Sequence, residues 1–113
     1  MKNDIAIIGG GPAGYNAAER AVANGLKTIL FEMKDLGGVC LNEGCIPTKA
    51  LLYSAKILYN INNASHYGIN GELKPQADIK KMIERKNKTV QTLTSGVAMK
   101  LKSMGVIIVK GKA

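Results

Sequence analysis

The chain has 113 residues, 46% hydrophobic side chains, a formal net charge of +8 and a mean hydropathy of +0.01. This length supports one small domain with a modest core, and the composition is that of a globular rather than a disordered chain. No apolar run approaches the ~20 residues of a membrane span, and the secretory cleavage pattern is missing, so we interpret the protein as cytoplasmic and expect no membrane partner.

The positive charge is unevenly distributed along the chain. Residues 1–49 carry five basic and five acidic side chains, whereas residues 50–113 carry eleven basic and three acidic ones. A basic half can bind nucleic acid or an acidic partner. Because these lysines are not interleaved with aromatic residues, we favour a solvated helix face and expect no nucleic-acid partner.

The first thirty residues predict one strand–helix–strand unit. Residues 5–8 are all apolar and fit a strand that is buried on both faces of a parallel sheet. Pro12 suits the first turn of a helix, and helix-forming residues continue to Ala23. Residues 28–31 are the second strand, which ends at Glu32.

An irregular segment and then a helix are predicted after the second strand. Residues 33–44 contain three glycines and are expected to be irregular. Pro47 belongs in a first helical turn, so the next helix begins near Ile46. Its apolar side chains recur at helical spacing and predict a face that packs against the core. They are Leu51, Leu52, Ala55, Leu58 and Tyr59.

The remaining residues predict a connection, a long helix and a third strand. Residues 60–75 are rich in turn formers, and Asp78 is suited to cap a helix that continues to about Lys102. Residues 106–109 are the third apolar strand. The pattern predicts an α/β chain with a parallel, Rossmann-like sheet. Because the last residues follow that strand directly, we expect residues 1–113 to be an incomplete part of a larger domain.

A glycine motif joins the first strand to the first helix. Gly9, Gly11 and Gly14 follow the pattern G-x-G-x-x-G, in which the first permits a tight turn, the second lets the backbone approach a pyrophosphate, and the third lets helix and strand pack closely. Glu32, at the end of the next strand, can accept hydrogen bonds from a ribose. This context predicts a dinucleotide site, and the alternative is an ordinary glycine turn.

Two cysteines, Cys40 and Cys45, lie downstream of the glycine motif. In a regular helix, residues five apart point about 140° from each other and cannot be bridged, but Gly44 and Pro47 indicate a break in regular helix. An irregular loop that leads into a helix can bring the thiols together, and the helix dipole then favours the Cys45 thiolate. The alternatives are two unpaired thiols, or a zinc site in which His66 is the only other suitable donor.

Lys49 lies in the first turn of the same predicted helix. A cation is unfavourable there for the helix dipole, which indicates that this lysine serves a ligand, although an ordinary surface lysine is the alternative. A chain with both a dinucleotide motif and a dithiol points to electron transfer between a bound dinucleotide and a disulfide.

The segment Gly37 to Lys49, GGVCLNEGCIPTK, resembles the redox-disulfide signature of the flavoprotein disulfide reductases. Within that family, Leu41, Ile46 and Thr48 are similar to the dihydrolipoamide dehydrogenases. Mercuric and glutathione reductases tend to have valine near these cysteines and remain the alternatives.

The resemblance implies FAD as the bound dinucleotide, with NAD as the final electron acceptor of the whole enzyme. The FAD pyrophosphate would lie against the glycine motif and its ribose against Glu32. Lys49 would lie near the reactive flavin nitrogen, and Ala113 near the adenine. The residues implied to bind FAD are Gly9, Gly11, Pro12, Ala13, Gly14, Glu32, Met33, Lys34, Gly37, Gly38, Val39, Cys40, Lys49 and Ala113.

The resemblance also implies a reaction. Cys40 and Cys45 would form a redox-active disulfide, in which Cys40 exchanges with lipoamide and Cys45 faces the flavin. The partner would be dihydrolipoamide or the lipoyl domain of a 2-oxoacid dehydrogenase or related complex, and the whole enzyme would be a homodimer. Residues 1–113 would be the N-terminal portion of its FAD-binding domain, without the NAD and dimer-interface domains. We therefore expect this chain alone to be inactive; a non-catalytic FAD-binding fragment is a further alternative.

Overall fold

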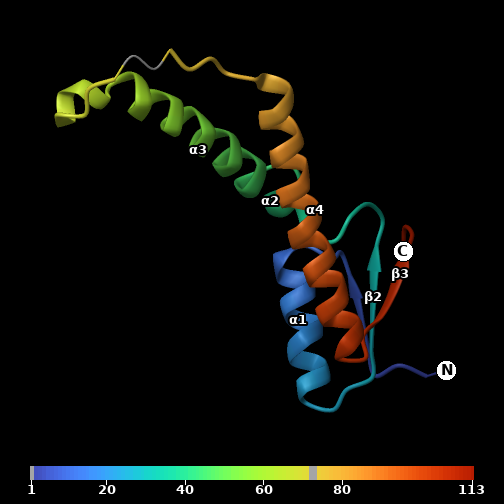
Figure 1. Ribbon diagram of the computed structural model, residues 1–113. Coiled ribbons are helices and arrows are strands. Elements are labelled where there is room, and N and C mark those ends of the chain that lie inside the picture. The colour runs from blue at the N-terminus through green and yellow to red at the C-terminus, as the bar shows by residue number, and fades with distance from the viewer. Residues whose placement is uncertain (1, 72–73) are drawn as a thin grey trace.

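The computed structural model describes residues 2–71 and 74–113. Three parallel strands form one sheet in the order β1-β2-β3. They are β1 (Ile5–Ile8), β2 (Thr28–Glu32) and β3 (Ile107–Lys110). Helices α1 (Pro12–Ala23) and α4 (Ile79–Ser103) pack together on one face of this sheet (Figure 1). The predicted α/β chain with a parallel sheet is therefore confirmed.

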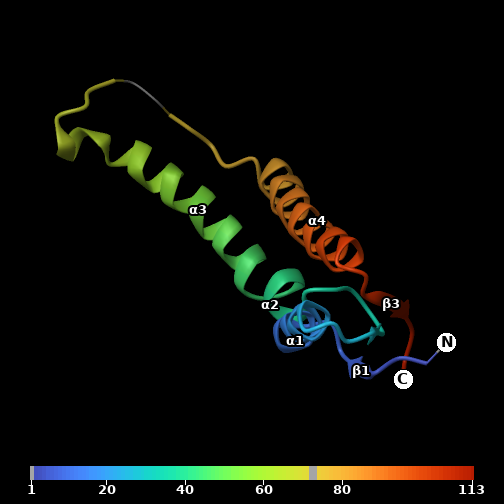
Figure 2. The same ribbon diagram turned by 90° about the horizontal axis from the view of Figure 1, so that it is seen from below.

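The other helices extend away from the sheet. A short helix, α2 (Gly38–Asn42), leads into α3 (Cys45–Asn62), and a 3-10 turn, η1 (Ala64–Tyr67), follows it. The start of α3 contacts α4, and its outer end projects away from the sheet in both views (Figures 1 and 2). We call α3 and η1 the helical arm. Because of this arm the Cα radius of gyration is 19.9 Å, against about 13 Å for a compact chain of this length.

The core is a small apolar cluster between the sheet and its two helices. Leu30 of β2, Leu101 of α4 and Ala18 of α1 are fully buried. The strand register places Ile7 and Ile108 on either side of Leu30, and both pack against this cluster. The three strands are thus held to α1 and α4 by one layer of side chains.

The prediction that β1 is buried on both faces is wrong. Ile5 is 36% exposed and Ile8 is 77% exposed. The reason is the layer arrangement: α1 and α4 cover one face of the sheet, and β1 is one of its two edge strands within the described part of the chain. A uniformly apolar run therefore did not distinguish a strand covered on both faces from one covered on a single face.

The predicted core face of α3 is also wrong, because its apolar side chains are largely exposed. Leu52 is 63% exposed and Tyr59 is 66% exposed. The face that packs against α4 contains Ala50 and Ser54 instead. The Arg85 guanidinium of α4 donates to the Ala50 carbonyl oxygen and to the Ser54 hydroxyl. Periodicity identified an apolar face of the helix, but the position of α4 decides which face is packed.

The element boundaries are close to the predicted ones, with one exception. Residues 33–44 are not irregular throughout, because α2 forms within them. Two left-handed glycines stand at its start, the N-cap Gly37 (φ +100°) and the first helical residue Gly38 (φ +62°). Asp78 caps α4 as predicted, and its carboxylate accepts from the Lys81 N–H at 3.0 Å.

The predicted connection over residues 60–75 is shorter than expected, because α3 continues to Asn62 and η1 follows it. Its residues 72 and 73 lie outside the described residues. The third strand begins one residue later than predicted. Among the described helices, none combines the length and the hydropathy that a bilayer span requires.

The position of Leu101 predicts a large loss of stability on truncation. Leu101→Ala is expected to lower the free energy of unfolding by about 2–5 kcal/mol, because it removes a fully buried side chain and leaves a cavity. The control, Leu52→Ala on the exposed face of α3, is expected to change it by less than about 0.5 kcal/mol. Urea denaturation followed by circular dichroism measures both, and equal losses would contradict the placement of the core.

Candidate dinucleotide and disulfide site

The three motif glycines occupy the loop between β1 and α1 and have different surroundings. Gly9 has φ of +95°, in the left-handed region that favours glycine. A Cβ atom on Gly14 would overlap the carbonyl oxygen of Gly9, so the close packing of helix and strand requires this glycine. A Cβ on Gly11 would meet only the Gly38 Cα, at an ordinary 3.7 Å. The fold itself therefore does not require a glycine at position 11. The space that a Cβ would occupy there is open to a ligand.

The N-terminus of α1 is suited to an anion. Gly11 is the N-cap residue and provides no side-chain cap, Pro12 is the first helical residue, and the first turn contains no acidic side chain. The N–H groups of Ala13 and Gly14 have no carbonyl partner within the helix, and the helix dipole adds a partial positive charge. These groups fit the pyrophosphate of a dinucleotide.

Glu32 lies at the end of β2, directly beside the glycine loop. One carboxylate oxygen accepts from the Gly10 N–H at 2.6 Å, and the other accepts from the Lys34 N–H at 2.8 Å. The Lys34 N–H, together with those of Gly10 and Met33, holds the pKa of the Glu32 carboxyl below its ordinary value, although burial acts in the opposite direction. The ionised carboxylate has further lone pairs, so it can also accept hydrogen bonds from ribose hydroxyls.

The segment Gly37 to Lys49, which we call the redox segment, contacts the glycine loop through backbone atoms of both. The Gly37 N–H donates to the Gly10 carbonyl oxygen at 2.8 Å. A Cβ on Gly38 would lie 2.9 Å from the Gly11 Cα, too close for any other residue without a shift. The glycines of the two motifs therefore form one contact surface, although 26 positions separate Gly11 from Gly37 in the sequence.

Cys40 and Cys45 are joined by a disulfide, with their Cα atoms 4.7 Å apart. Cys40 lies in α2, whereas Cys45 is the first residue of α3 and follows Gly44, the N-cap. The break in regular helix that the sequence predicted thus lies between them. At this helix N-terminus the dipole favours the thiolate of Cys45 once the disulfide is reduced.

The predicted metal alternative finds no support in the arrangement of donors. Within residues 2–71 and 74–113, no group of three or more histidine, cysteine, aspartate or glutamate side chains could hold a metal ion. His66 lies in η1, at the outer end of the arm (Figure 1).

Two cavities bring half of the predicted cofactor residues together. One, of about 310 Å³, is lined by Gly9, Glu32, Met33 and Ala113, among others. Gly111 also lines this cavity, and its N–H donates to the Glu32 carbonyl oxygen at 2.9 Å. Residues from the first strand, the second strand and the end of the third strand thus share one space.

The second cavity, of about 230 Å³, shares Glu32 and Met33 with the first. It is lined by Met33, Lys34, Gly38 and Val39, all predicted cofactor residues, and by Asn42. Lys49 is exposed on α3 and lines neither cavity. The two cavities therefore group Gly9 with the residues predicted for the adenosine and with part of the segment before Cys40. Gly11, Gly14 and Lys49 line neither of them.

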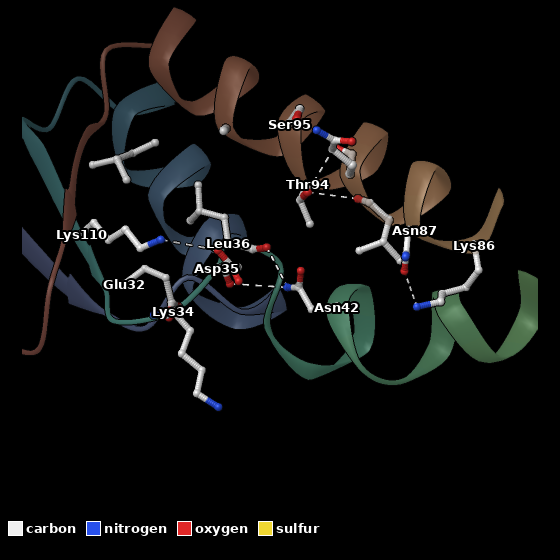
Figure 3. A pocket seen from close by; sticks show the side chains of 14 residues that line it. Glu32, Lys34, Asp35, Leu36, Asn42, Lys86, Asn87, Thr94, Ser95 and Lys110 are labelled. Atoms are coloured by element: carbon white, nitrogen blue, oxygen red, sulfur yellow. Dashed lines mark hydrogen bonds and ion pairs between the residues drawn. The ribbon is translucent and has the colours of Figure 1, made fainter. Parts of the chain in front are cut away.

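Sequence reasoning missed a larger cavity, of about 470 Å³, between the loop after β2 and α4 (Figure 3). Its α4 wall carries polar side chains, Asn87, Gln91, Thr94 and Ser95. Lys110 of β3 reaches Asp35 across its end, at 3.6 Å between the charged atoms. The sequence holds no signal for this cavity, because it depends on where α4 crosses the loop.

Known proteins are similar to this chain in sequence and in fold. Residues 3–113 match the model of the pyridine nucleotide-disulphide oxidoreductase family. The backbone is similar to the crystal structure of LpdA from Mycobacterium tuberculosis, with a TM-score of 0.83 and 25% identity over 95% of this chain and 23% of that one. It is also similar to the flavoprotein disulfide reductase RclA from Escherichia coli, with a TM-score of 0.75 and 30% identity over 96% of this chain and 22% of that one.

Curated relatives are named dihydrolipoyl dehydrogenase. The Bacillus subtilis protein is 48% identical over 112 residues, which are 96% of this chain and 24% of that protein. The Trypanosoma brucei brucei protein is 45% identical over 112 residues, 97% of this chain and 23% of that protein. The chain thus spans about a quarter of the length of these relatives. It belongs to the pyridine nucleotide-disulphide oxidoreductase family, since the family model matches nearly all of it.

The two hydrogen bonds to Glu32 predict a pH dependence of stability. The pKa of Glu32 is lower in the folded than in the unfolded chain, so the carboxylate stabilises the folded state. This stabilisation is fully present above pH 4.5, the ordinary pKa, and is lost as the pH falls through the pKa of the folded chain. Glu32→Gln is expected to lower stability at neutral pH, by about 1–3 kcal/mol, because one buried N–H donor loses its acceptor.

Urea denaturation at a series of pH values tests this expectation. Below pH 4.5, the difference in unfolding free energy between the wild type and Glu32→Gln should shrink. Glu84→Gln on the exposed side of α4 is the control and should follow the wild type throughout. A difference that stays constant down to low pH would contradict the assignment.

Proposed function

We propose that this chain supplies the FAD-binding glycine loop and the redox disulfide of a dihydrolipoyl dehydrogenase. Such an enzyme oxidises dihydrolipoamide to lipoamide, with NAD as the final electron acceptor. The observation that carries the proposal is the backbone contact between the two motifs, the Gly37 N–H on the Gly10 carbonyl. Because the relatives are about four times as long, we assign residues 1–113 to the N-terminal portion of the FAD-binding domain only.

The residues present fit FAD at the positions that the sequence predicted. The open space at Gly11 and the free N–H groups of Ala13 and Gly14 would hold the pyrophosphate. Glu32 would accept from the ribose, and Ala113 would border the adenine. When bound, FAD supplies a ring that accepts two electrons from the dithiol.

The cysteine pair carries the thiol chemistry of the proposal. A thiolate of dihydrolipoamide attacks the Cys40 sulfur, which breaks the disulfide, forms a mixed disulfide and releases the Cys45 thiolate. The second substrate thiol then attacks the mixed disulfide, so that lipoamide leaves and Cys40 becomes a thiol. Two electrons have passed to the cysteines, and of the two substrate protons one is on Cys40 and the other goes to solvent.

The position of Cys45 suits its part in this exchange. It is the first residue of an 18-residue helix, whose N-terminus stabilises a leaving thiolate. Cys45 is also more exposed than Cys40, and we place the flavin over it. Lys49, one turn further on, would lie near the flavin. The substrate would be free dihydrolipoamide or the lipoyl domain of a 2-oxoacid dehydrogenase or related complex, and the whole enzyme would be a homodimer.

A second candidate function is that of another flavoprotein disulfide reductase. The backbone likeness to RclA, at 30% identity, favours it. The two candidates share FAD and the disulfide and differ in the final substrate, so the substrate has to be measured.

The native gene product is expected to have a flavin spectrum and to form NADH from dihydrolipoamide. The separate 113-residue chain is expected to bind FAD weakly or not at all and to form no NADH, since it spans about a quarter of its relatives. Oxidised glutathione and mercuric ion, each with NADPH, are the comparison substrates. Turnover of either one in place of dihydrolipoamide would favour the second candidate, and a native product without flavin would contradict both.

Gly11→Ala is expected to reduce the FAD content of the native gene product at least tenfold without unfolding it. The added Cβ occupies the phosphate space but meets only the Gly38 Cα in the protein. Gly96→Ala, which adds a Cβ in open space on α4, is the matched control and should keep its FAD. Flavin absorbance per protein and the melting temperature are measured together, and full FAD retention in Gly11→Ala would remove the phosphate assignment.

A further inference from the structure

Asn42 lies between the two cysteines of the disulfide, as the last residue of α2. Its side-chain nitrogen donates to the Leu36 and Gly38 carbonyl oxygens, both at 3.0 Å, and lies 3.5 Å from the Asp35 carbonyl oxygen. Figure 3 shows this amide directed at the loop that contains Asp35 and Leu36. The Asn42 side chain thus links the segment before Cys40 to a position two residues after Cys40.

The short helix that carries Cys40 needs such a tie. α2 has five residues, and a helix of this length is unstable by itself in water. Its N-cap Gly37 and its first residue Gly38 have left-handed backbones, and glycine loses more conformational freedom on folding than any other residue type. Further contacts must therefore fix the position of Cys40. The Asn42 amide provides one to a residue outside α2, the Leu36 carbonyl oxygen, and its bond to the Gly38 carbonyl oxygen closes the helical turn that contains Cys40.

We infer that Asn42 is a positioning residue that keeps Cys40 within reach of Cys45 when the disulfide is open. This inference rests on the proposed function, since it assumes that the disulfide opens and closes. In the oxidised chain the disulfide itself holds the two residues together. In the reduced chain that bond is absent, and the Asn42 hydrogen bonds would order residues 36–42, which include Cys40.

Loss of this restraint has a defined effect on the redox equilibrium. The disulfide closes residues 40–45, and the Asn42 hydrogen bonds order residues 36–42, so the two share residues 40–42 and each lowers the entropic cost of the other. When two glutathione molecules reduce the disulfide, its S–S bond breaks, a new S–S bond joins the glutathiones, and their two protons pass to Cys40 and Cys45. Without the Asn42 hydrogen bonds, the dithiol has more conformations, and re-forming the disulfide costs more conformational entropy. The equilibrium therefore shifts toward the dithiol.

The test compares the glutathione redox equilibrium of the full 113-residue chain with that of its variants. Asn42→Leu keeps the approximate size of the side chain and removes the N–H donors without adding charge. It is expected to favour the dithiol about tenfold, which is about 30 mV for a two-electron couple. Asn24→Leu removes a comparable bond, 2.7 Å to the Arg20 carbonyl oxygen, far from the disulfide, and should leave the equilibrium unchanged. Alkylation and mass spectrometry count the thiols.

The outcomes separate this inference from the proposed function. A role in folding alone would lower the melting temperature of the oxidised and reduced chains equally and leave the equilibrium unchanged; an unchanged equilibrium in Asn42→Leu therefore overturns the inference. A wild-type chain that does not form the disulfide reversibly would instead contradict the proposed function.

A measurement on the wild type covers the case in which Asn42→Leu does not fold. The hydrogens of the Asn42 side-chain amide should exchange with solvent at least tenfold more slowly than those of Asn62, an exposed residue at the end of α3, in both redox states. Nuclear magnetic resonance of the labelled chain resolves the two amides. Equal exchange rates in the reduced chain would overturn the inference.

Discussion

The peptide group of Gly10 connects the two halves of the candidate site. Its N–H donates to the Glu32 carboxylate, and its carbonyl oxygen accepts from the Gly37 N–H. A Cβ on Gly10 would lie 2.5 Å from the Leu36 Cδ2, so the end of that side chain would have to move to accept one. The Gly10 peptide therefore fixes both Glu32 and Gly37 relative to the glycine loop.

This connection would allow the glycine loop and the disulfide to act on one cofactor, as we propose. Each hydrogen bond contributes only about 0.5–1.5 kcal/mol net, but the two share one rigid peptide, so the groups that they bind cannot move independently. Gly38 then approaches Gly11 to a distance that no larger residue allows. The space over Gly11, proposed for the pyrophosphate, thus lies next to the short helix that carries Cys40.

The sequence predicted the elements and the motifs well, because their signals are local. Pro12 in a first helical turn, Asp78 as a cap and the spacing of the motif glycines depend on a few neighbouring residues. The sequence did not predict α2, the packed face of α3 or the role of Asn42. These depend on contacts between residues far apart in the chain, such as Arg85 with Ala50, and periodicity alone does not identify the partner of a face.

A redox disulfide must open without unfolding the chain, and the arrangement here meets this requirement. The two cysteines are five residues apart, and a loop of this length contributes only about 2 kcal/mol on the chain-entropy estimate. The core around Leu30 and Leu101 lies between the sheet and its helices and includes neither cysteine. Hydrogen bonds from Asn42 and Gly37, which do not involve the sulfur atoms, hold the segment around Cys40. The contacts that hold the fold thus do not include the S–S bond, as the proposed role of the disulfide in electron transfer requires.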